Sequence, residues 1–82
     1  MSKYQQEWKK VLQQQIEFKD WKIRTSGGDI LIRVPQITDM KLLEDRFPGL
    51  ILSLLPLIEA PKSSLKFYIG QSAQSDFIYT LI

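Results

Sequence analysis

The stretch that decides the fold is Gly27–Leu57, with the sequence GGDILIRVPQITDMKLLEDRFPGLILSLLPL. It predicts a turn, then a strand that Pro35 ends, and then a long apolar helical segment. Ile30, Ile32 and Val34 alternate along the strand and therefore point to one face of a sheet. Because most aliphatic residues of the chain lie in this stretch, the hydrophobic core must form around it.

The helical segment begins after Thr38 or Asp39, either of which can cap a helix with a side-chain oxygen. Pro48 lies inside the apolar pattern, where a proline removes one hydrogen bond and costs about 3 kcal/mol. We therefore expect a kink at Pro48 or a split into two helices, the second of which ends near Ile58. A strand over Leu50–Leu55 is the alternative interpretation.

Upstream of this stretch, the periodicity predicts an amphipathic helix from Ser2 to about Phe18. Ser2 and Gln5 have the spacing of a capping box, in which each side chain serves a free backbone N–H group. The expected inward face of this helix comprises Tyr4, Trp8, Val11, Leu12 and Ile16.

A strand over Trp21–Thr25 follows, and the glycine-containing turn Ser26–Asp29 connects it to the next strand as a hairpin. A loop of four residues pairs Ile23 with Ile32. This register places the apolar side chains of both strands on one face of the sheet. The opposite face then carries Lys22, Arg24, Leu31 and Arg33.

Two further strands, Leu65–Ile69 and Asp76–Leu81, flank a polar turn near the end of the chain. The order helix, strand, strand, helix, strand, strand predicts an α+β fold, in which helices cover one face of a mostly antiparallel four-stranded sheet. A length of 82 residues favours one domain over residues 1–82. A circularly permuted ferredoxin-like sheet and a KH-like arrangement both fit this order.

The composition argues against several classes of function. The chain has neither cysteine nor histidine, so the usual ligands of zinc, haem and iron–sulfur clusters are missing. Glu44 and Asp45 are adjacent and point about 100° apart on a helix, so they cannot face each other as an acid–base pair. We therefore predict no enzyme, no cofactor and no metal.

The apolar run Leu50–Ile58 is about half as long as the roughly 20 residues that span a membrane. The polar start of the chain lacks the apolar core of a signal peptide. We therefore expect a cytoplasmic protein that does not enter the membrane.

The same run has more apolar side chains than packing on one sheet can bury. We therefore expect a protein partner or a second copy of the chain to bury the rest. This pattern favours a non-catalytic protein–protein interaction module. The candidate contact residues are Leu31, Leu50, Leu52, Leu54 and Leu57.

The alternative is a nucleic-acid-binding module that uses the basic face of the sheet. Lys22, Arg24 and Arg33 can contact phosphates, and Tyr68 or Tyr79 can stack on a base. Neither an RNP-like aromatic motif nor a GxxG loop accompanies them.

The chain also resembles the amino-terminal domain I of the bacterial replication initiator DnaA, a small KH-like α+β domain. The matching residues are Trp8, Phe18-Lys19-Asp20-Trp21, Asp29–Pro35, Leu42–Leu55 and Leu65–Ile69. The resemblance implies a protein-binding role in DNA replication. In that role Trp8 serves self-association and Glu17 contacts a helicase.

Overall fold

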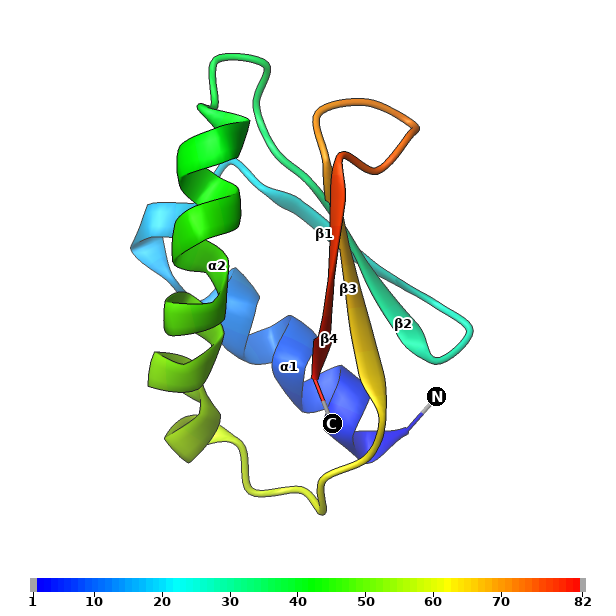
Figure 1. Cartoon of the computed structure of the whole chain (residues 1–82). Helices are drawn as coiled ribbons and strands as arrows, with labels where there is room; N and C mark the ends of the chain where they lie inside the picture. The colour runs from blue at the N-terminus through cyan, green and yellow to red at the C-terminus, as the bar shows by residue number, and fades with distance from the viewer. Residues whose placement is uncertain (1, 82) are drawn as a thin grey trace.

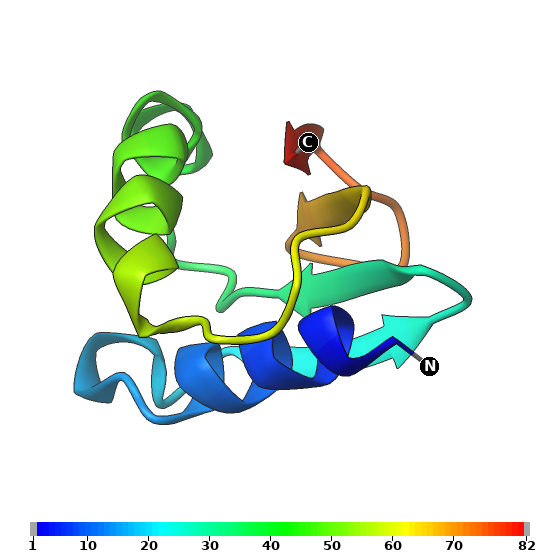
Figure 2. The same ribbon diagram turned by 90° about the horizontal axis from the view of Figure 1, so that it is seen from below.

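The computed structural model describes residues 2–81, which form two helices packed on one face of a four-stranded sheet (Figures 1 and 2). The helices are α1 (Lys3–Gln13) and α2 (Met40–Leu54), followed by the short 3-10 helices η1 (Ile16–Phe18) and η2 (Leu55–Leu57). The strands are β1 (Lys22–Ser26), β2 (Asp29–Arg33), β3 (Leu65–Gly70) and β4 (Phe77–Leu81). The predicted α+β class and the order of its main elements are confirmed.

The strands lie in the sheet in chain order, β1-β2-β3-β4. The β1–β2 and β3–β4 pairs are antiparallel hairpins, and the central β2–β3 pair is parallel. A parallel pair requires a long connection that returns the chain to the same end of the sheet, and α2 supplies this connection. The sheet is therefore mixed, with antiparallel pairs at both edges.

The β1–β2 hairpin has the predicted register, with Ile23 opposite Ile32 and Arg24 opposite Leu31. Gly27 has a φ of 57°, in the left-handed region that favours glycine. The inward residues Ile23 and Ile32 are buried, and the outward Arg24 is exposed.

Gln5 attaches α1 to this hairpin. Its side-chain Nε2 donates hydrogen bonds to the carbonyls of Gly27 (3.0 Å) and Asp29 (2.6 Å). Ser2 caps α1 as predicted, accepting a 3.1 Å hydrogen bond from the Gln5 backbone N–H. Only half of the predicted capping box forms, because the Gln5 side chain is turned to the hairpin through Nε2; its Oε1 is buried and accepts no hydrogen bond from the described residues.

Of the two outcomes expected at Pro48, a kink or a split into two helices, the split is wrong. Helix α2 continues through Pro48 to Leu54, and Asp39 caps its start by accepting a hydrogen bond from the Leu42 N–H (3.1 Å). Pro48 leaves the carbonyl of Glu44 without its helical donor, but Glu44 is exposed, so water can serve that carbonyl. The strand alternative for Leu50–Leu55 is likewise wrong.

Aromatic contacts join both helices to the sheet in the core. Phe67 of β3 contacts Trp8 of α1 and Phe47 of α2, with ring centroids 5.5 and 5.7 Å apart. Ile16 was expected in this core but is 85% exposed. Because α1 ends at Gln13 and η1 follows, the helical spacing that pointed Ile16 inward does not extend to it.

Within residues 2–81, no helix is both long enough and apolar enough to cross a membrane.

Candidate binding face of the sheet

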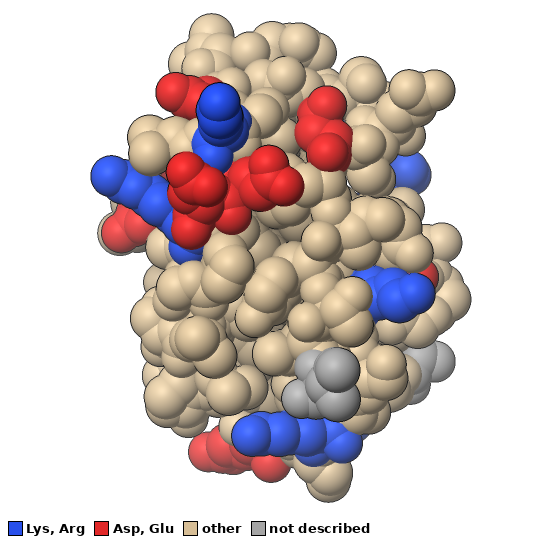
Figure 3. Space-filling view, viewed as in Figure 1, with Lys and Arg blue, Asp and Glu red and all other residues tan. Residues whose placement is uncertain are grey.

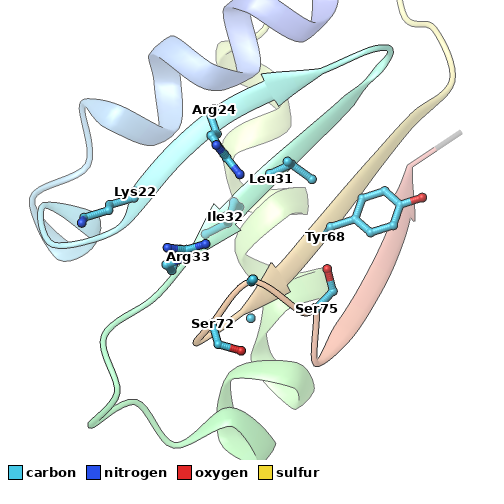
Figure 4. A pocket seen from close by; sticks show the side chains of 10 residues that line it. Lys22, Arg24, Leu31, Ile32, Arg33, Tyr68, Ser72 and Ser75 are labelled. Atoms are coloured by element: carbon cyan, nitrogen blue, oxygen red, sulfur yellow. The ribbon is translucent and has the colours of Figure 1, made fainter.

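The helices cover one face of the sheet and leave the other, here called the outer face, without a covering element (Figures 2 and 4). The registers of the three strand pairs align one residue of each strand in a row across this face. This central row consists of Arg24, Leu31, Tyr68 and Ile78. It combines a cation, an aromatic ring and two aliphatic side chains on a surface open to a ligand.

Three basic residues, here called the cation cluster, lie at the β1–β2 end of the outer face: Lys22, Arg24 and Arg33. Lys22 is directly opposite Arg33 in the ladder, and Arg24 is two residues from Lys22 on β1. All three side chains are exposed, and none forms an ion pair with another described residue. Figure 4 shows Arg24 and Arg33 extending over the same part of the face. Like charges directly opposite each other destabilise a sheet, so the pairing of Lys22 with Arg33 carries an electrostatic cost.

A shallow pocket of about 160 Å³ lies beside the cation cluster (Figure 4). Leu31 and Tyr68 of the central row line it, and Ser72 and Ser75 line it from the loop that connects β3 to β4. No acidic residue of the described range 2–81 lines this pocket. Asp20 lines a neighbouring hollow together with basic residues of the cluster. The arrangement therefore favours an anionic ligand.

The loop that forms the wall of the pocket is held in place by hydrogen bonds. The Gln71 side-chain Nε2 donates to the carbonyls of Gln36 (3.0 Å) and Thr38 (2.9 Å). The Gln36 side chain donates in return to the Gln71 carbonyl (2.9 Å). At the end of the loop, the Asp76 backbone N–H donates to the Ile69 carbonyl (2.7 Å). The loop is thus tied both to β3 and to the connection between β2 and α2.

The two tyrosines considered for base stacking lie on opposite faces. Tyr68 is on the outer face, paired with Leu31 on one side and Ile78 on the other. Tyr79 is opposite Phe67, on the inner face, and its ring lies 5.7 Å from that of Phe47. Only Tyr68 therefore lies on the surface that carries the cation cluster.

The predicted protein-contact residues do not form one surface. Trp8 and Leu54 are buried, and Leu50 is half-buried against the core. Leu52 and Leu57 are 57% and 56% exposed. Leu31 is half-buried on the outer face, away from the helices, and Glu17 is exposed in η1.

Trp8 has no exposed surface, so in the folded domain it offers nothing to a partner. Its ring instead meets Tyr4 and Phe67 edge to face. The structure therefore supports a packing role for Trp8.

Within the described part of the chain, no group of three acidic residues is placed to hold a metal ion. None of the family models, curated proteins or solved structures compared with the chain matches it. The functional argument therefore depends on the geometry of the outer face, and the resemblance to the initiator domain stays a prediction.

Sequence reasoning identified the cation cluster but missed the contributions of Ser72, Ser75 and Ile78. Ile78 follows from alternation, because Phe77 and Tyr79 on either side of it point inward. The two serines could not be found in this way, because the β3–β4 loop has no period that relates it to the sheet.

Proposed function

We propose that this domain is a non-catalytic binding module that takes single-stranded nucleic acid on the outer face of its sheet. The observation that carries the proposal is the cation cluster, in which Lys22 and Arg33 stand directly opposite each other and one carboxylate, Asp20, lies in the neighbouring hollow. A bound phosphate chain would replace the repulsion among these side chains with attraction. The electrostatic energy of the cluster is therefore more favourable with a polyanion bound than in the unliganded domain.

The chemistry of the face fits a single strand more closely than a duplex. Arginine side chains can bind phosphate oxygens with two parallel N–H groups, which suits Arg24 and Arg33. Tyr68 and Leu31 lie beside the cluster and offer a ring and an aliphatic surface to an unstacked base. A duplex keeps its bases stacked inside and cannot use these two side chains.

Binding should depend on the cation cluster and on salt. We expect a fluorescent single-stranded oligonucleotide of mixed sequence to bind with a log–log salt slope of about −2 if three phosphates are contacted. The variant Arg24→Gln/Arg33→Gln should bind at least tenfold more weakly. The matched control is Lys41→Gln/Arg46→Gln, which removes the same charge from exposed positions of α2. Fluorescence anisotropy measures each affinity.

The role of Tyr68 is tested in the same assay. Tyr68→Ala should lose about 1–3 kcal/mol of binding free energy, the value of one base–aromatic stack, whereas Tyr68→Phe should retain most of the affinity.

Equal losses of affinity in the cluster variant and in its α2 control would show that net charge alone attracts the oligonucleotide. That result, or a preference for duplex, would refute the proposed site.

A protein partner is the second candidate function. Leu52 and Leu57 favour it, because both remain more than half exposed on a helical segment that carries no charge between Phe47 and Ile58. Exchange of both leucines for serine should weaken such a contact without unfolding the domain, since neither belongs to the buried core. Analytical ultracentrifugation of the wild-type protein and the double-serine variant measures the loss of association.

A further inference from the structure

The two edges of the sheet differ in how they are protected. Exposed edge strands invite pairing with other strands, and proteins commonly protect them with charges, prolines or bulges. Strand β1 carries Lys22 and Arg24 at its edge. Strand β4, with the sequence FIYTL, has neither charge nor proline and pairs with β3 without a bulge. The β4 edge therefore lacks each of these protections.

The hydrogen bonds of the sheet identify which backbone groups of β4 are free. The Val34 N–H donates to the Gly70 carbonyl (2.9 Å), so the peptide groups of Gly70 face β2. Because these groups alternate along a strand, those of Phe67 and Ile69 face β4. Their partners Tyr79 and Phe77 face back toward β3.

The N–H and C=O groups of Ile78 and Thr80 consequently point to the open edge. Among residues 2–81, no hydrogen bond to these groups is found. A strand is the partner that can satisfy both residues together, because it presents N–H and C=O groups at the same spacing.

The surface around the β4 edge carries few charges, although the exposed Lys66 lies opposite Thr80 in the ladder. Figure 3 shows charged side chains gathered over the N-terminal half of α2, while the region of β4 and the C-terminal half of α2 is nearly free of them. The sequence agrees, since no charged residue occurs in β4 or between Phe47 and Ile58. Ile78 adds an apolar side chain that is 55% exposed.

We propose that the β4 edge pairs antiparallel with the β4 edge of a second copy of this chain. A two-fold axis at Tyr79 places Ile78 of one copy opposite Thr80 of the other, and the free groups then form four hydrogen bonds. The second copy fits because its strand is equally uncharged, so pairing brings no like charges together. A strand with charged side chains would find no opposite charge within β4 itself.

Self-pairing through this edge would extend the proposed nucleic-acid site. The outer faces of the two copies lie on the same side of a continuous eight-stranded sheet, two copies of four strands. Five strand spacings of about 4.8 Å put the two β2 strands about 24 Å apart, so the two cation clusters lie at least that far from each other. Self-association itself does not depend on nucleic acid and is measured without it.

Thr80→Pro is the most direct test, because it removes one free N–H group and leaves the ladder with β3 intact. We expect the wild-type protein to sediment as a dimer at micromolar concentration, and Thr80→Pro to sediment as a folded monomer. The control Thr80→Ala keeps the backbone donor and should remain dimeric. A wild-type monomer at millimolar concentration, or a dimeric Thr80→Pro, would overturn the proposal.

Cross-linking tests the register even if the proline variant fails to fold. The chain has no cysteine, so an equimolar mixture of Ile78→Cys and Thr80→Cys reports only on the introduced thiols. The proposed register puts these positions opposite each other, at a Cα separation of about 5.5 Å that suits a disulfide. Mild oxidation should give mainly the mixed disulfide. If no mixed disulfide forms, or if the three possible disulfides form in statistical proportions, the two β4 strands do not pair in this register. The same result is expected if β4 pairs with an unrelated strand, so it would count against the proposal.

Discussion

Gly70 shows how a single residue builds the wall of the candidate site. It is buried at the end of β3, and a Cβ atom there would collide with the backbone carbonyl of Gln74. The β3–β4 loop therefore folds back over β3 only because this residue has no side chain. We expect Gly70→Ala to lower the free energy of unfolding by about 1–3 kcal/mol, the usual cost of overpacking. Urea denaturation measures the change.

The matched control is Gly28→Ala, where a Cβ meets open space and the backbone does not need a positive φ. That variant should be neutral, or more stable by about 0.4–1 kcal/mol, because alanine restricts the unfolded chain. Equal effects at the two positions would show that the loop does not depend on the close approach at Gly70.

Alternation along strands made the basic residues of the site predictable, while the apolar candidates were harder to assign. Two-residue spacing placed Lys22 and Arg24 on one face, the hairpin register added Arg33 to it, and the structure confirms this placement. Leucines of α2 could not be sorted in the same way, because the run from Leu50 is apolar on nearly every side of the helix, with Ser53 as its one polar residue before Pro56. Only packing against the sheet decides that Leu54 is buried and Leu52 is not.

Helix α2 contains the clearest conflict between local preference and tertiary packing. Pro48 and Gly49 are poor helix formers in its interior, but Phe47 and Ile51 on either side are almost fully buried. We expect Pro48→Ala to raise the free energy of unfolding by up to about 3 kcal/mol, because it restores a donor for the Glu44 carbonyl. Thermal and urea denaturation report this gain.

Gly49→Ala is the companion variant, since a Cβ at Gly49 meets open space and alanine is favoured there by about 1 kcal/mol. A loss of stability in Pro48→Ala beside a gain in Gly49→Ala would show that packing of the half-buried proline ring outweighs the missing hydrogen bond.

The secondary-structure elements were largely predictable, and their arrangement was less so. The turn at Gly27, the caps at Ser2 and Asp39 and the hairpin register all follow from local rules. The continuity of α2 does not follow from local rules. The cost of Pro48 can be seen in the local sequence, but the burial of side chains that offsets it depends on the tertiary fold. Parallel pairing of β2 with β3 was also inaccessible, since it depends on how α2 returns the chain across the sheet.

The whole domain illustrates that charge distribution, more than net charge, indicates a partner. A net charge of +2 is too small to predict a polyanion. The fold nevertheless places Lys22, Arg24 and Arg33 together on the outer face, and it places the uncharged β4 at the other edge of the same sheet. The basic end suits a phosphate chain, and the uncharged edge suits another copy of the domain.

If both proposals hold, the advantage of the dimer in binding should depend on the length of the oligonucleotide. A strand of about 4 nucleotides, at the lower end of known site sizes, reaches one cation cluster and should bind wild type and Thr80→Pro equally. A strand of about 16 nucleotides can reach both clusters of a dimer. Linking two sites raises affinity by about 10²–10⁴-fold, so the longer strand should bind wild type far more tightly than the proline variant. Anisotropy with both oligonucleotides measures this difference. Equal gains with length in the two proteins would show that the clusters of a dimer do not act on one strand.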